Sequence, residues 1–253
     1  MIKFLIALFF IVTVIASFDL GPLLNSIMPI LSVISLFLAT WLHGLNRYGW
    51  KEMLVFFAIT WVISHAMEAI SIQTGFPFGH YHYEKLGGPR IFEVPIVIMF
   101  AYFGMIYLSW TLSQILTRWN VVFTPIIATF VMVMWDLAVD PLSSTIASLW
   151  VWEQGGTYFG VPLQNYFGWF LTVYLIFQVF ALYVQGSGVL SKTAKVEAIV
   201  LYGIQSLVFP LSFAFVNSNS DIYGPMALVS FFTMGFVVVL SLVKVYQEDP
   251  VRL

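Results

Sequence analysis

The chain has 253 residues, of which 60% are hydrophobic and 9% are charged, and its mean hydropathy is +0.94. A water-soluble globule of this composition has too little polar surface to cover itself, so we expect an integral membrane protein. The net charge is -2 and no basic block is present, which excludes nucleic acid as a partner. The absence of Cys excludes disulfides, a thiolate nucleophile and Cys-based metal sites.

Long apolar runs follow one another along the chain. A transmembrane helix needs about 20 mostly apolar residues, and eight runs qualify: residues 2–18, 23–45, 51–73, 94–117, 120–141, 164–185, 195–216 and 224–246. The sequence therefore predicts an all-α polytopic bundle of about eight transmembrane helices, forming one integral-membrane domain over residues 1–253. The first run also resembles a signal peptide, because Lys3 precedes it and small residues end it.

Lys and Arg are unevenly distributed among the loops between these runs. Cytoplasmic loops carry an excess of Lys and Arg. If the N-terminus is cytoplasmic, eight of the ten basic residues fall inside: Lys3, Arg47, Lys51, Arg118, Lys192, Lys195, Lys244 and Arg252. Only Lys85 and Arg90 fall outside. We therefore expect both termini in the cytoplasm of a multi-pass protein of the cell membrane.

Two long loops, residues 74–93 and 142–163, are predicted on the outer side. The first contains GFPFGHY and the second GGTYFGVPLQNYFGWF, and each helix that follows restarts at Val-Pro. Pro95 and Pro162 then lie where a first helical turn tolerates proline. Pro95 comes 27 positions after Glu68, and Pro162 comes 26 after Asp136. This pattern suggests two related helix, loop, helix hairpins.

Ionisable groups inside membrane spans are rare and usually mark function. Glu68 lies near the end of the third run, with His65 three residues before it on the same helical face. Asp136 and Asp140 are four residues apart near the outer end of the fifth run, so they point the same way. We expect all three acids to converge on one site beneath the two long loops.

Structural roles are the alternative for each of these residues. Asp140 precedes Pro141, where helices commonly stop, so it is alternatively an interfacial residue in contact with water. Asp136 and Glu68 are alternatively hydrogen-bonding partners of neighbouring helices. His65 is more simply a hydrogen-bonded partner of Glu68 than a ligand.

Histidines and aromatic residues surround the acids in the sequence. His80 and His82 share a face if their segment is extended, which suits a metal or an interfacial lid. We favour the lid, because no third or fourth ligand is evident nearby. Among the tryptophans, Trp135, Trp150 and Trp152 come nearest to the acids and the second loop. Aromatic faces stabilise cations, so these residues are candidates for lining a site where positive charge develops. Most aromatic residues of a membrane protein, however, serve in packing or at the interface.

Motifs of several enzyme classes are missing from the chain. No Lys lies in the middle of a run, so a retinal Schiff base is excluded. The patterns G-x-x-x-x-G-K-[ST], G-x-G-x-x-G and H-E-x-x-H do not occur, and four His are too few for the histidine boxes of a di-iron oxygenase. What remains is acid and base chemistry on a molecule that dissolves in lipid.

Four stretches of the chain resemble the integral-membrane carotenoid hydratases, of the bisanhydrobacterioruberin hydratase and γ-carotene 1'-hydratase type. They are EAISIQTGFPFGHYHYEKLGG, EVPIVIMFAYFGMIYLSW, MWDLAVDP and WVWEQGGTYFGVPLQNYFGW, and they cover a core of about residues 68–170. The resemblance implies addition of water, without a cofactor, to the terminal double bond of an acyclic (ψ) carotenoid end, which gives a tertiary alcohol. The implied partners are a lipid-soluble carotenoid, membrane lipid and other carotenoid-pathway enzymes.

Protonating an alkene requires a carboxylic acid that keeps its proton at neutral pH, a state favoured by apolar surroundings or a neighbouring carboxylate. We expect Asp136 to be this acid, with Glu68 and Asp140 holding the water and the counter-charge. No metal is expected. The residues expected to contact the substrate or its water are His65, His80, Tyr81, His82, Trp135, Trp152, Tyr158, Phe159 and Asn165. Phe76 and Phe78 are expected to shield the end group together with Phe159.

Two other functions compete with this hypothesis. A membrane prenyltransferase uses paired aspartates to hold Mg²⁺ and diphosphate, and DLAVD supplies one such pair. A second aspartate-rich motif and basic diphosphate ligands are not found. A proton-coupled transporter would use the three acids as a proton relay between two repeats.

Overall fold

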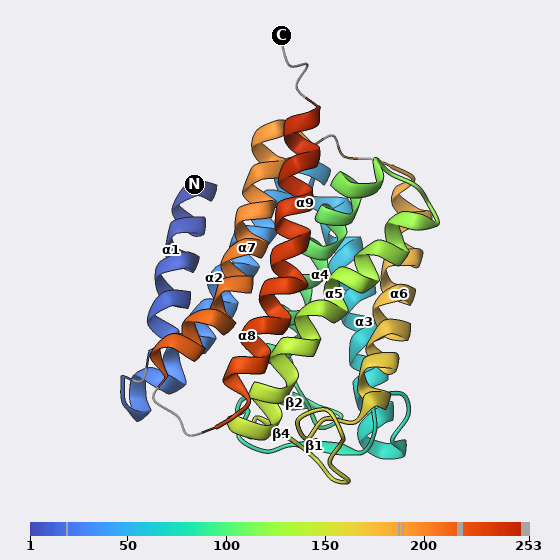
Figure 1. Ribbon diagram of the computed structural model, residues 1–253. Helices are drawn as coiled ribbons and strands as arrows, with labels where there is room; N and C mark the ends of the chain where they lie inside the picture. The colour runs from blue at the N-terminus through green and yellow to red at the C-terminus, as the bar shows by residue number, and fades with distance from the viewer. Residues whose placement is uncertain (19, 187, 189, 217–219, 249–253) are drawn as a thin grey trace.

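In the computed structural model, the described part of the chain comprises residues 1–18, 20–186, 188, 190–216 and 220–248. Each expected apolar run forms a helix, and the last run is divided in two (Figure 1). The helices are α1 (Ile2–Ala16), α2 (Pro22–Tyr48), α3 (Trp50–Thr74), α4 (Ile96–Thr117), α5 (Phe123–Asp140), α6 (Leu163–Val184), α7 (Lys192–Phe215), α8 (Tyr223–Phe232) and α9 (Met234–Gln247). The prediction of an all-α membrane bundle is confirmed.

Seven helical segments of the described chain are long and apolar enough to cross a membrane. Here α5 counts together with the helical turn after it, and α8 together with α9. The remaining helix, α1, has 15 residues. At a rise of about 1.5 Å per residue, α1 is shorter than the roughly 30 Å hydrocarbon core of a bilayer.

Helix α4 lies at the centre of the bundle. It contacts α2, α3, α5, α7 and α9, and its side chains from Ile98 to Ile115 are buried almost without interruption. A helix surrounded by other helices needs no polar stripe, which explains why apolar residues occur on every side of α4.

Short strands lie at one end of the bundle, between α3 and α4 and between α5 and α6 (Figure 1). Strand β1 (Tyr81–Tyr83) pairs antiparallel with β4 (Trp150–Trp152), and β2 (Arg90–Ile91) pairs with β3 (Val94–Pro95). The β1–β4 sheet, called the lid below, therefore joins the two long loops that the sequence singled out.

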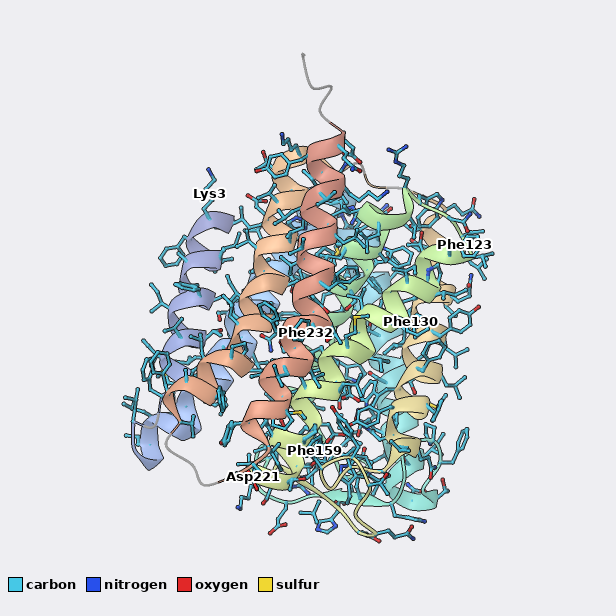
Figure 2. The ribbon with its side chains drawn as sticks, viewed as in Figure 1. Lys3, Phe123, Phe130, Phe159, Asp221 and Phe232 are labelled. Carbon is cyan, nitrogen blue, oxygen red and sulfur yellow. The ribbon has the colours of Figure 1, made fainter. Side chains whose placement is uncertain are left out.

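The start of α1 and the end of α9 lie at the end of the bundle opposite to the strands (Figure 1). Lys3 marks that end, whereas Phe159 and Asp221 lie at the strand end (Figure 2). This arrangement agrees with two termini on one side of a membrane. The assignment of that side to the cytoplasm stays a prediction.

Prolines mark where both loops return to helix. Pro95 and Pro162 are extended, with ψ of 129° and 137°, and each precedes the first residue of its helix. Both therefore lie one residue before the first helical turn in which they were expected. At the end of α5, Pro141 does not stop the helix as expected, because a π-helix η1 (Pro141–Ile146) continues it.

Candidate active site

The lid covers a small cavity at the strand end of the bundle. Its wall contains the three expected acids, Glu68 from α3 and Asp136 and Asp140 from α5, together with aromatic side chains and Asn165 from α6. The cavity leaves about 30 Å³ of free space for water-sized molecules. This is room for one or two ordered waters.

The carboxyl group of Glu68 is 2% exposed and accepts hydrogen bonds on both oxygens. Tyr83 donates to Oε2 at 2.8 Å, and Tyr81 donates to the same oxygen. Tyr102, from α4, donates to Oε1 at 2.6 Å. Three hydroxyl groups from two different elements thus converge on one carboxyl group.

Asp136 and Asp140 are bridged by one side-chain amide. Nδ2 of Asn165 donates to Oδ2 of Asp136 at 3.1 Å and to Oδ2 of Asp140 at 2.6 Å. The other oxygen of Asp140 accepts the indole N–H of Trp150 at 2.8 Å and, at a long 3.4 Å, that of Trp152. No side chain of the described residues hydrogen-bonds Oδ1 of Asp136.

Strand alternation explains how the lid reaches the acids. In the β1–β4 register Tyr81 faces Trp152 and Tyr83 faces Trp150, and side chains at every second position of a strand share a face. These four aromatic side chains therefore point together into the bundle. They supply four of the donors on Glu68 and Asp140.

The alternation places His82 on the outer face of the lid. Its side chain is 54% exposed and lies 3.7 Å from Oε1 of Glu153. His80 precedes the strand and packs against Gly75, at the end of α3. Neither histidine belongs to the cavity wall. The expected contact of His80 and His82 with substrate or water stays a prediction.

His65 does not hydrogen-bond Glu68, contrary to expectation. Both ring nitrogens of His65 are buried and have no hydrogen-bond partner among the described residues, and the ring stacks on Trp61 with the ring centroids 6.3 Å apart. The Glu68 oxygens instead accept three tyrosine hydroxyls. The alternative of a water-facing Asp140 is also contradicted, since Asp140 is 1% exposed.

The remaining expected residues divide between the cavity wall and its surroundings. Trp135, Trp152 and Asn165 line the cavity. Tyr158 instead donates to the carbonyl oxygen of Leu137 at 3.1 Å, outside the wall. Phe159 packs edge-on against Tyr158 and is 37% exposed at the strand end (Figure 2).

Two polar atoms of the cavity-lining side chains are buried and find no hydrogen-bond partner in the described part of the chain. They are the indole N–H of Trp135 and Oδ1 of Asn165. Buried polar groups of native proteins are usually hydrogen-bonded, so these atoms are suitable partners for water in the cavity.

The side chains that hydrogen-bond the three acids are uncharged. Across the described ranges, no Lys, Arg or His forms an ion pair with Glu68, Asp136 or Asp140. Nor does any group of three or more His, Asp or Glu side chains in those ranges form a site that could hold a metal ion. In the described residues, charge on these carboxyl groups is therefore stabilised by uncharged hydroxyl, indole and amide donors.

Three further cavity-lining residues, Tyr83, Tyr102 and Trp169, were not expected at the site from the sequence. Tyr83 was detectable, because an extended segment places it on the same face as Tyr81. Tyr102 and Trp169 lie in apolar helices, where nothing in the sequence distinguishes a cavity-lining aromatic residue from one that packs elsewhere.

Comparisons with known proteins point to carotenoid metabolism. The family described as carotenoid biosynthesis protein matches residues 24–239. A bisanhydrobacterioruberin hydratase from Haloarcula japonica is 30% identical over 115 residues, which cover 43% of this chain and 38% of that relative. The match thus spans less than half of the relative's length. No solved structure matches the chain significantly.

Proposed function

Because the chain belongs to the carotenoid biosynthesis protein family, we propose that it is a carotenoid hydratase of the cell membrane. In this proposal it adds water across the terminal double bond of an acyclic carotenoid end group and forms a tertiary alcohol. The name of the Haloarcula relative, a bisanhydrobacterioruberin hydratase, supports the reaction class. The three buried acids support the chemistry, which needs no cofactor.

The three acids accept different numbers of hydrogen bonds, and this difference supports the assignment of their roles. Glu68 accepts three hydroxyl groups, and Asp140 accepts two indoles and an amide. Within the described residues, the side chain of Asp136 accepts one donor, the amide that it shares with Asp140. Donors stabilise the charged form of a carboxyl group. Among the three, Asp136 is therefore the acid that retains a proton.

The reaction begins with proton transfer from Asp136 to the less substituted carbon of the double bond. The π electrons form the new C–H bond, and the tertiary carbon becomes a cation. Negative charge on Glu68 and the faces of Trp135 and Trp169 in the cavity wall stabilise this cation. Placing the proton on that carbon is favoured because it gives the more stable cation.

Water then attacks the tertiary cation and forms the C–O bond. Asp140 accepts the proton that the water loses. This proton then moves from Asp140 to Asp136, and the two carboxyl groups share the Asn165 amide. The transfer restores the starting state. The net change is one alkene and one water to one alcohol, so neither an oxidant nor a cofactor is consumed.

The size of the cavity adds a requirement. About 30 Å³ suits water but not a branched hydrocarbon end group. The lid, which covers the cavity with two short strands, therefore has to shift when the end group binds.

The prenyltransferase alternative requires cationic ligands for diphosphate, and no Lys or Arg lines the described wall of this cavity. A proton-coupled transporter would show uptake that depends on a proton gradient, whereas a hydratase would not.

Expression in hosts that make lycopene or bisanhydrobacterioruberin tests the proposal. Mass spectrometry of the extracted pigments should reveal products heavier by one or two waters. Glu68→Gln, Asp136→Asn and Asp140→Asn should each depress this product while the protein still reaches the membrane. Unchanged pigment in both hosts, with folded protein present, would refute the hydratase proposal. Full activity in all three variants would refute the site.

A further inference from the structure

Three tyrosine hydroxyls surround the Glu68 carboxyl group, and we call Tyr81, Tyr83 and Tyr102 the tyrosine cage. Each phenol has one proton to donate, and all three donate to Glu68. Because both carboxyl oxygens act as acceptors, the arrangement suits an ionised carboxylate. A protonated Glu68 would need one of its oxygens to act as a donor instead.

We propose that the tyrosine cage holds Glu68 ionised while the lid is seated, so that Glu68 is the counter-charge of the site and not its proton donor. This inference rests on the proposed hydration, because it assigns the cage to the cation formed there. The three tyrosines are positioning residues, since they act through Glu68.

The phenols keep their protons in this environment. Burial raises the pKa of Tyr81 and of Tyr83 well above the usual value, and the charge on Glu68 raises both further. Both residues lie in the lid, outside the helical spans. They therefore remain donors and do not transfer their protons to Glu68.

Aromatic neighbours hold the cage rings in place. Tyr81 packs against Trp152 with ring centroids 4.9 Å apart, and Tyr102 packs edge-on against Trp169 at 4.6 Å. Donors that are oriented before reaction need no rearrangement when charge develops. The cage thus fixes the direction in which the Glu68 charge acts.

Two of the three donors come from the lid strand and one from the central helix α4. Glu68 therefore holds its full set of donors only while β1 is seated. The hydrogen bonds of Tyr81 and Tyr83 therefore stabilise both the seated position of the lid and the charge on Glu68. The donor set of Glu68 is complete when the lid is seated over the cavity.

Infrared difference spectroscopy of the full-length protein in lipid nanodiscs tests the ionisation directly. The spectrum of the wild type minus that of Glu68→Gln should contain a carboxylate stretching band. In the Tyr81→Phe/Tyr83→Phe/Tyr102→Phe background, this band should be replaced by the carbonyl band of a protonated acid. A protonated-acid band for Glu68 in the wild type would overturn the inference.

Turnover measurements separate positioning from support of the fold. Tyr102→Phe keeps its ring and leaves the lid strand unchanged, and it should lower kcat about 10-fold with KM nearly constant, as loss of one hydrogen bond to a charged group predicts. The matched control is Tyr202→Phe, whose buried hydroxyl donates to the carbonyl oxygen of Val131 at 2.9 Å. Equal kcat losses in both variants would contradict a specific role for the cage.

The two proposals fail in distinguishable ways. If no hydrated pigment forms but the Glu68 carboxylate band responds to the tyrosine substitutions, the ionised cage stands and the hydratase proposal falls. If hydrated pigment forms but Glu68 is protonated in the wild type, the hydratase proposal stands and the cage inference falls.

Discussion

The hairpin of α3 and α4 and the hairpin of α5 and α6 use the same plan with different donors. In the first, strand β1 sends tyrosine hydroxyls to Glu68. In the second, strand β4 sends tryptophan indoles to Asp140. The two strands pair with each other, so each hairpin contributes at least one acid and half of the lid.

The second hairpin differs by one additional acid and a π-helical turn. Asp136 is the counterpart of Glu68 when each is counted back from the Val-Pro restart, whereas Asp140 lies one turn further on, directly before η1. π-Helical turns occur frequently at functional sites. The extra acid has to share the Asn165 amide. The first hairpin thus contains one carboxyl group with three donors, whereas the second contains two carboxyl groups with different numbers of donors.

The largest expected effect is loss of the proton donor in the second hairpin. Asp136→Asn removes the proposed acid, and general acid catalysis typically contributes about 10²- to 10⁴-fold. We therefore expect hydrated pigment to fall at least about 100-fold, measured by mass spectrometry at equal protein level. Asp221→Asn, at an exposed position at the same end of the bundle (Figure 2), should leave the product unchanged. An active Asp136→Asn variant would remove the proposed asymmetry between the acids.

The next effect concerns the amide shared by the two aspartates. Asn165→Ala removes the donor from both carboxyl groups, and a hydrogen bond to a charged group such as the proposed Asp140 carboxylate contributes about 1.5–3 kcal/mol. The rate of hydration should fall about 10- to 100-fold in time courses of pigment conversion. The control is the neighbouring Gln164→Ala, which removes only a bond to the carbonyl oxygen of Gly75 at 2.8 Å. Similar rates for the two variants would mean that the shared amide does not distinguish the acids.

The lid indoles should have smaller and graded effects. Trp150→Phe removes a donor at 2.8 Å from Asp140, whereas Trp152→Phe removes one at 3.4 Å. Hydrogen bonds weaken as this distance grows. We expect about a 10-fold loss of initial rate for Trp150→Phe and a smaller loss for Trp152→Phe. The reverse order would show that ring packing, rather than donation to Asp140, is what the β4 indoles contribute.

The smallest expected effect is on the outer face of the lid. His82→Ala removes only a half-exposed contact with Glu153, and exposed ion pairs contribute about 0–1 kcal/mol. Conversion should stay within about twofold of the wild type, measured in the same pigment assay. A large loss would restore His82 to the substrate site, in agreement with the sequence-based expectation.

Much of the fold follows from the sequence because bilayer constraints are local. Each membrane helix satisfies its own backbone hydrogen bonds, so the length and hydropathy of each run were sufficient to locate the helices. The three acids were also recognisable, because charge inside an apolar run is costly wherever the run packs. The expected hydrogen bond between His65 and Glu68 was wrong, because helical spacing says which residues are near each other but not which partner is preferred.

Hydropathy and the few charges within the apolar runs were therefore sufficient to predict the membrane class, the helical bundle and the candidate acids. Which donors reach which acid depends on how the helices and the lid pack. Tyr102 lies 34 positions from Glu68, and Trp150 reaches Asp140 through strand pairing between distant loops. The physical reason is that hydropathy is a property of each segment, whereas the state of a buried carboxyl group depends on side chains that only packing brings within about 3 Å.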